Sequence, residues 1–104
     1  MPLPKNSFGQ IAAITTFTVD PEDRPTFVSL TLQHCERSLR EELHTIQMEL
    51  LVLPDDESSV VLFGIFLDKD AFADHLKGDR VKEHFGLTGK MIKSANIVQY
   101  VIAC

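Results

Sequence analysis

The stretch VVLFGIFLDKDAFADHLKGDRVKEHF, residues 60–85, decides the fold of this chain. Its first eight residues are apolar or glycine, a length typical of one buried strand and too short for an ordinary helix. Asp68 comes next and can cap a new helix, while Asp70 places negative charge in the first turn, where the helix dipole favours it. The stretch therefore predicts a buried strand followed directly by a helix.

The predicted helix carries a histidine among its apolar side chains. Ala71, Phe72, His75 and Leu76 are spaced so that they share one face of a helix. That face holds most of the apolar side chains of the segment, so it is expected to lie against the preceding strand. His75 is therefore expected among the apolar groups that face the strand.

A second short helix is expected immediately after the first. Gly78 can end the first helix in a left-handed conformation, and Asp79 can cap the next one. Val81 and Phe85 then fall on one side of this second helix, and residues 86–89 are expected to form a loop.

Length and composition indicate one soluble globular domain spanning all 104 residues, with 44% apolar and 24% charged residues. The net charge of −5, with no Lys/Arg cluster, disfavours nucleic acids and anionic membrane surfaces as partners. No apolar run approaches the ~18 residues of a membrane span, and Cys35 and Cys104 have neither disulfide-framework nor zinc-finger spacing. A cytoplasmic location is the default expectation. Residues 1–7, which hold two prolines, are expected to form an irregular arm.

The remaining elements follow from alternation and turn residues. β-Branched and apolar residues alternate in three segments, which predicts strands, and a run of Pro, Asp, Glu and Ser predicts a turn. Proline is tolerated in the first turn of a helix and not in its interior, so the long helix should begin near Arg24 or Pro25. The predicted elements are strands over residues 8–19, 43–53 and 93–104, a helix over 24–41 and a turn over 54–58.

The order of the elements indicates a ferredoxin-like α+β fold. Strand, helix, strand, strand, helices and strand form an antiparallel sheet with helices on one face and a right-handed crossover. The other face would carry Ile14, either Met48 or Leu51, and the apolar end of the last strand, which a monomer leaves open. A homodimer with two such sheets face to face is the simplest way to cover these groups.

The long predicted helix carries a narrow apolar stripe. Cys35 lies inside this stripe, and a buried structural thiol is favoured over a nucleophile because no basic residue is placed to lower its pKa. His34 is expected to be exposed on the helix flank. The stripe consists of Val28, Leu32, Cys35 and Leu39, widened by Phe27 and Thr31.

The segment FGIFLDKDAFADHLKGDRVKEHF, residues 63–85, resembles the signature of the antibiotic biosynthesis monooxygenase domain. The resemblance extends as a pattern over nearly the whole chain and implies a dimeric α/β barrel. It also relates the chain to small oxygenases that act on quinols without a cofactor. The matching positions are Gly64, Phe66, Asp68, Ala71, Phe72 and His75.

Two positions on the buried strand depart from the family pattern. Gly64 replaces a glutamate, and Phe66 replaces a Tyr or Trp. Phe66 and Leu62 stand where quinone-forming members have a Trp and an Asn, and the chain has no tryptophan. Haem degradation is disfavoured, because His75 and Phe85 stand where that branch has its Trp and its iron-ligating His. Gly64 is expected to mark a bulge or close packing in preference to ligand access.

His75 is the best candidate for a catalytic group. A cofactor-free oxygenase must deprotonate a phenol or quinol, so that the anion can pass an electron to oxygen, and this requires a base in an apolar pocket. Histidine is the side chain that titrates closest to neutrality without tuning, and Phe66, Phe72 and Phe85 are candidates for aromatic walls against a flat substrate. The competing interpretation is a packing histidine that bonds a carbonyl and meets no substrate.

Three further polar residues are weaker candidates for substrate contacts. His44 begins a strand and His84 lies on the last short helix, and for both a place at the surface is favoured. Asn96 on the last strand could donate a hydrogen bond to a substrate oxygen, although a position at a sheet edge explains it equally well. The four histidines lie on separate elements without metal-ligand spacing, so neither a metal nor another cofactor is expected.

Three functions remain open. The first is a cofactor-independent monooxygenase that acts on a quinol or polycyclic phenol, with His75 as general base. The second is a non-catalytic module that binds a small apolar or aromatic molecule, or only dimerises. The third is an isomerase or lyase in which His75 shuttles a proton. An apolar chamber with His75 in its wall is what a small-molecule site requires.

Overall fold

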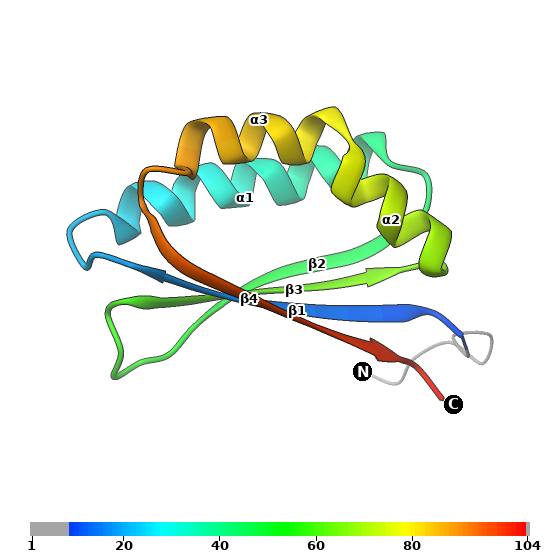
Figure 1. Ribbon diagram of the computed structural model, residues 1–104, viewed down its shortest axis with the longest axis horizontal. Coiled ribbons are helices and arrows are strands. Elements are labelled where there is room, and N and C mark those ends of the chain that lie inside the picture. Colours follow the sequence, from blue (N-terminus) through cyan, green and yellow to red (C-terminus); the bar gives the residue numbers. More distant parts are fainter. Residues whose placement is uncertain (1–8, 104) are drawn as a thin grey trace.

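A computed structural model describes residues 9–103 as a four-stranded antiparallel sheet with three helices on one face (Figure 1). The strands lie in the order β2-β3-β1-β4, which confirms the ferredoxin-like α+β fold. The irregular arm expected over residues 1–7 lies outside the described part of the chain. The elements are β1 (Ile11–Val19), α1 (Arg24–Glu41), β2 (Thr45–Val52), β3 (Ser59–Phe66), α2 (Lys69–Lys77), α3 (Asp79–Thr88) and β4 (Ile92–Val101).

The buried strand of the deciding stretch, β3, lies inside the sheet. It pairs antiparallel with β2 on one edge and with β1 on the other, and β1 in turn pairs with β4. Because β3 has a neighbouring strand on both sides, it can be apolar along its whole length without exposing an aggregation-prone edge. The two edge strands, β2 and β4, carry charged and amide side chains, which β1 and β3 lack.

The helix layer packs against the sheet through two apolar clusters. At one end, Phe27 of α1 packs against Phe17, with ring centroids 5.1 Å apart, and against Val19 and Val60. At the other end, Phe72 of α2 packs with three residues of the sheet. Burying each phenylalanine contributes roughly 1.5–3 kcal/mol. The sheet residues of this second cluster are Ile11, Ala13 and Phe66.

The start of α2 is as expected, whereas the boundary between α2 and α3 is not. The Asp68 side chain accepts a hydrogen bond of 2.8 Å from the backbone N–H of Ala71, which confirms the predicted cap. Gly78 has φ −74° and ψ 162°, an extended conformation, so the prediction of a left-handed glycine is wrong. Asp79 is the first residue of α3 and its side chain makes no capping bond, because extended Gly78 occupies the capping position.

Helix α3 is longer than predicted, and no loop forms over residues 86–89. The Thr88 hydroxyl donates a hydrogen bond of 2.7 Å to the carbonyl of His84. The backbone N–H of Gly89 donates one of 2.8 Å to the carbonyl of Phe85. These bonds extend the helix beyond Gly86. A glycine inside a helix costs about 1 kcal/mol relative to alanine, which is too little to end the helix here.

Strand β2 contains an irregularity that sequence alternation hides. Its register against β3 shifts between Thr45 and Gln47. One extra residue in a strand reverses the faces of all residues on one side of it. As a result Met48 faces the helices and is buried, while Leu51 lies on the open face and is half-exposed.

The buried face of α1 matches the predicted stripe only in part. Phe27, Thr31 and Cys35 are buried as expected. Leu32 and Leu39 are instead 46% and 43% exposed. Phe27 has the largest side chain on the helix and enters the core, and the face that it defines continues at spacings of four, three and four residues. Three of the residues on this face are polar. The buried residues are Phe27, Thr31, His34, Cys35 and Ser38.

The helices of the described chain fall short of the requirements of a membrane span. None of those in residues 9–103 is both long enough and apolar enough to cross a bilayer.

Candidate functional site

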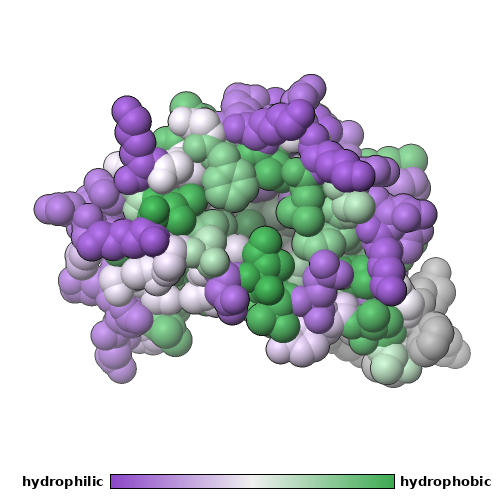
Figure 2. Space-filling model, viewed as in Figure 1, coloured by the Kyte–Doolittle hydropathy of each residue, from purple (hydrophilic) through white to green (hydrophobic). Residues whose placement is uncertain are grey.

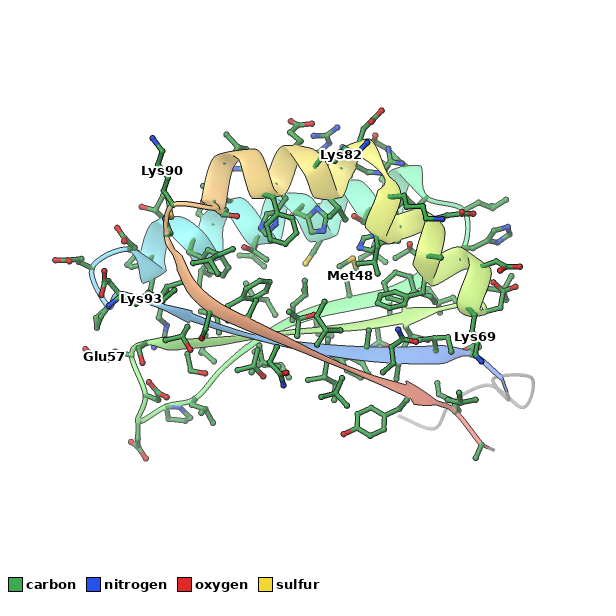
Figure 3. The ribbon with its side chains drawn as sticks, viewed as in Figure 1. Met48, Glu57, Lys69, Lys82, Lys90 and Lys93 are labelled. Carbon is green, nitrogen blue, oxygen red and sulfur yellow. The ribbon has the colours of Figure 1, made fainter. Side chains whose placement is uncertain are left out.

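A hollow lies between the helix layer and the sheet and opens beside β4. The space between its lining atoms totals about 520 Å³, a value that includes gaps too small for a ligand and the part that is open to solvent. In Figure 2 apolar side chains gather around this opening, and hydrophilic side chains rim it. Met48 points from β2 toward the helices, whereas Lys82 and Lys90 point away from the interior (Figure 3). An apolar interior with a few polar groups is the usual form of a small-molecule site.

Two small residues on neighbouring strands form part of the sheet side of this hollow. Ala13 of β1 and Gly64 of β3 are register partners, and Met48 of β2, which also pairs with Gly64, lines the hollow beside them. A Cβ atom on Gly64 would lie 2.9 Å from Cε2 of Phe66, so the glycine allows the aromatic ring to lie over the strand. The pairing is regular at Gly64, so the alternative of a bulge there is wrong and the alternative of close packing is confirmed.

Aromatic rings form the walls of the hollow. The Phe66 and Phe72 centroids lie 4.9 Å apart, and Phe66 is also 4.9 Å from the His75 ring. Phe85 of α3 and Ile97 of β4 line the hollow near its opening and are each 48% exposed. These rings offer flat apolar surface to a flat ligand.

The His75 imidazole lies in the wall of the hollow and is held from behind by a carboxylate. Its Nδ1 atom lies 2.6 Å from Oε1 of Glu42, and the two side chains are only 6% and 11% exposed. An ionised carboxylate can only accept hydrogen bonds, so Nδ1 carries the proton and donates it. The remaining ring nitrogen, Nε2, is then a hydrogen-bond acceptor.

Glu42, the C-terminal cap of α1, is fixed by two further donors. The Thr45 hydroxyl donates a hydrogen bond of 2.6 Å to Oε1, and Nε of Arg80 donates one of 2.7 Å to Oε2. Burial alone would raise the pKa of the Glu42 carboxyl, but the hydrogen bonds from Thr45, Arg80 and His75 lower it below its ordinary value. Glu42 is therefore an ionised acceptor at neutral pH.

Two more histidines lie beside His75, and the three form a histidine cluster on the helix side of the hollow. The His34 ring stacks on the His84 ring with centroids 4.7 Å apart and lies 5.5 Å from the His75 centroid. Nε2 of His84 and the hydroxyl of Thr31 share a hydrogen bond of 2.9 Å. His34 and His84 are 6% and 6% exposed, so the predictions of an exposed His34 and a surface His84 are both wrong.

Burial keeps His34 and His84 uncharged. It lowers the pKa of His34 to about 4, helped by repulsion from His84 and His75 and opposed by the Glu42 charge. It also lowers the pKa of His84. Nδ1 of His34 and the hydroxyl of Ser38 are buried without a hydrogen-bond partner in the described chain, so this helix face is polar and incompletely paired.

Two of the predicted site residues do not reach the hollow. His44 is exposed just before β2 and lines a separate outer groove on the far side of His75. Asn96 of β4 pairs with Thr16 of β1 and lies on the sheet face opposite the helices. Of the predicted residues, the hollow brings together His75, Phe66, Phe72, Phe85 and His84.

Sequence reasoning missed Glu42 and the burial of His34. Glu42 and His75 are 33 residues apart in the chain, so no local pattern connects them. The burial of His34 had a signal, because it lies seven residues after Phe27 and three after Thr31 on one helical face.

Metal and thiol chemistry find no support in the described residues. Within residues 9–103 no group of three or more His, Cys, Asp and Glu side chains has a geometry that could hold a metal ion. Burial raises the pKa of the Cys35 thiol to about 11, so this side chain is a protonated structural thiol.

Comparisons with known proteins point to one family. The family model for antibiotic biosynthesis monooxygenases matches residues 10–86. A conserved protein of Methanosarcina mazei Go1 has a similar structure, with a TM-score of 0.83, 22% identity, and coverage of 91% of this chain and 94% of that one. A Caulobacter crescentus CB15 protein, provisionally named an antibiotic biosynthesis monooxygenase, gives a TM-score of 0.87 at 17% identity over 93% and 92% of the two chains.

A third structure similar to this chain is a variant of SnoaB, a cofactor-independent oxygenase from Streptomyces nogalater. It has a TM-score of 0.76 and 18% identity, and covers 90% of this chain and 93% of its own. At these identities the structural similarity shows the fold alone. No match was found among curated proteins.

Proposed function

Since the chain belongs to the antibiotic biosynthesis monooxygenase family, we propose that it is a cofactor-independent monooxygenase whose substrate is a quinol or polycyclic phenol bound in the hollow. The observation that carries this proposal is the His75 ring in the wall of the hollow, 2.6 Å from the Glu42 carboxylate. A flat substrate would lie between the rings of Phe66 and Phe85, with one hydroxyl directed at the imidazole.

In the proposed reaction His75 is the general base. The phenol O–H bond breaks as an N–H bond forms at Nε2, which leaves an electron-rich phenolate in an apolar space. Removal of that proton lets the ring carbon give electrons to molecular oxygen. A C–O bond forms at a ring carbon that bears hydrogen, and the proton returned by His75 completes a hydroperoxide there. The C–H and O–O bonds then break, so that one oxygen atom stays on the ring as a quinone carbonyl and the other leaves as water.

Oxygen uptake with menadiol tests this proposal. We expect His75→Ala to lower the enzymatic rate by roughly 10²- to 10⁴-fold, the usual contribution of a general base. His44→Ala is the matched control, because His44 is exposed and lies outside the hollow. His75→Asn provides a second variant of similar size if the alanine variant is unstable.

The outcomes of this assay separate the three functions. Uptake that exceeds the spontaneous rate and needs His75 supports the monooxygenase. Proton exchange without oxygen consumption would instead indicate an isomerase or lyase. Saturable menadiol binding without turnover would indicate a binding module and contradict the proposal.

A homodimer through the open face of the sheet is proposed as the working form. Ile14 and Phe63 are register partners on that face, and Leu51, Val98 and Tyr100 on the same face are 50%, 39% and 54% exposed. Apolar side chains on a sheet face without helices favour a second sheet as cover.

Sedimentation velocity tests the dimer. We expect the wild type to sediment as a dimer at micromolar concentration and Val98→Asp to sediment as a monomer, because a buried unpaired charge is strongly unfavourable. Leu87→Asp is the control, since Leu87 lies on α3 and is 56% exposed. A monomeric wild type would contradict the proposal.

A further inference from the structure

We infer that Glu42 is a positioning residue for His75: its carboxylate holds the proton on Nδ1 and thereby presents Nε2 to the substrate as the base. This inference rests on the proposed function for its catalytic meaning, although the arrangement of the two side chains can be tested without any turnover.

Three donors fix the orientation of the Glu42 carboxylate. His75 Nδ1 and the Thr45 hydroxyl both bond Oε1 at 2.6 Å, and Arg80 bonds Oε2 at 2.7 Å. These donors come from α2, β2 and α3, while Glu42 itself caps α1. A carboxylate held by three elements has little freedom to rotate, so its bond to the imidazole is directional.

The location of His75 gives that bond a chemical consequence. The outer groove is a polar surface depression lined by Glu42, Thr45, Asp74 and Arg80 among others. Of the described residues, His75 alone lines both this groove and the apolar hollow. Its ring therefore forms the partition between them, with Nδ1 directed at the carboxylate.

The carboxylate also stabilises the product of proton transfer. When Nε2 takes the phenol proton, the ring becomes an imidazolium that carries a proton on each nitrogen. A charge of this kind is unfavourable beside an apolar hollow unless it is paired. The Glu42 carboxylate at 2.6 Å provides that pairing, so the substrate anion can form without leaving an unpaired imidazolium at His75.

The neighbouring Glu41 provides a matched comparison. It bonds Arg37, Arg40 and Arg80, so it belongs to the same ion-pair network. Among the described residues it makes no hydrogen bond or ion pair with His75, and it is more exposed than Glu42. Removing the Glu41 charge should therefore disturb the network around Arg80 without touching the imidazole.

The test compares Glu42→Gln with Glu41→Gln by long-range ¹H–¹⁵N correlation of the histidine rings, recorded above the pH range in which an ordinary histidine titrates. In the wild type and in E41Q we expect a protonated Nδ1 and an unprotonated Nε2. In E42Q the amide oxygen should turn to Arg80, which is only a donor, and its NH₂ group should face His75. We therefore expect the proton to move to Nε2.

Kinetics provide the second readout. With menadiol, E42Q should lower kcat by roughly 10²- to 10⁴-fold, because the wrong tautomer faces the substrate, and leave KM little changed. Glu42→Asp keeps the charge and should restore part of the rate and the wild-type tautomer. E41Q should keep both the wild-type rate and the wild-type tautomer of His75.

Two results would overturn the inference. One is a wild-type His75 with its proton on Nε2, and the other is an E42Q variant with an unchanged tautomer. Should E42Q fail to fold, Thr45→Val removes one donor from Oε1 and must leave the proton on Nδ1. If the wild type shows no oxygen uptake but the tautomers behave as expected, the proposed reaction fails while the positioning role of Glu42 stands.

Discussion

The sheet side and the helix side of the hollow differ in the polar groups that they contribute. The sheet lines it mainly with apolar and small residues such as Phe66, Ala13 and Gly64, whereas the helices add three imidazoles, backed by Glu42 and Thr31, to their apolar side chains. Apolar burial stabilises the fold, but buried polar groups do so only when they are paired. Under the proposed function, this difference means that the helix side is adapted to chemistry at the expense of stability.

The largest effect is expected on the apolar side, from Phe27→Ala. Phe27 is fully buried between α1 and the sheet, so its loss should destabilise the protein by about 3–5 kcal/mol. Urea denaturation at neutral pH measures this loss. A loss below about 1 kcal/mol would mean that burial of apolar side chains between the helices and the sheet does not dominate the stability of the protein.

The next effect belongs to the polar side and depends on pH. Burial lowers the pKa of His34 from 6.5, the value of an unperturbed side chain, to about 4 in the folded protein. Between these values the unfolded chain binds a proton that the folded protein does not, so stability falls as the pH drops from about 6.5 to 4, by up to roughly 3 kcal/mol.

His34→Gln should remove that part of the acid destabilisation. The measurement is the free energy of unfolding in urea at several pH values, with His44→Gln as the exposed control. Equal pH dependence in the wild type and in His34→Gln would show that the histidine cluster is not held neutral by burial.

Gly64→Ala tests the shape of the sheet side of the hollow. The added methyl group would lie 2.9 Å from the Phe66 ring, so the ring must move into the hollow. We expect a destabilisation of about 1–3 kcal/mol, accompanied by weaker menadiol binding in fluorescence or calorimetric titration. Unchanged binding would mean that the ligand does not lie over β3.

The smallest effect is expected from Thr31→Val, which keeps the shape of the side chain and removes its hydroxyl. His84 then loses its partner at 2.9 Å, so we expect a loss of about 1 kcal/mol in thermal or urea unfolding. A variant more stable than the wild type would show that this polar pair is not needed on the helix side.

The same division explains what could be predicted from the sequence. Strands, the cap at Asp68 and the position of His75 follow from local spacing, and the structure contains them. The shift in β2 at residue 46 and the Glu42–His75 bond depend on contacts between distant segments. Local alternation cannot reveal either of them.

The helix side was harder to predict because its buried face is polar. The stripe containing Leu32 and Leu39 is the more apolar one, yet both side chains are half-exposed. Besides Phe27, Thr31 and Cys35, which the predicted stripe contains, the polar residues His34 and Ser38 are buried. Hydrophobic periodicity favours the wrong face when a helix directs polar groups inward.

The most direct test of the central claim is an anaerobic titration with menadiol, followed by ¹H–¹⁵N correlation of the histidine rings. If a flat phenol binds in the hollow, the Nε2 signal of His75 should shift in a saturable way while the signals of exposed His44 remain in place. An unchanged His75 signal at saturating menadiol, with shifts confined to the open sheet face around Asn96, would contradict the account.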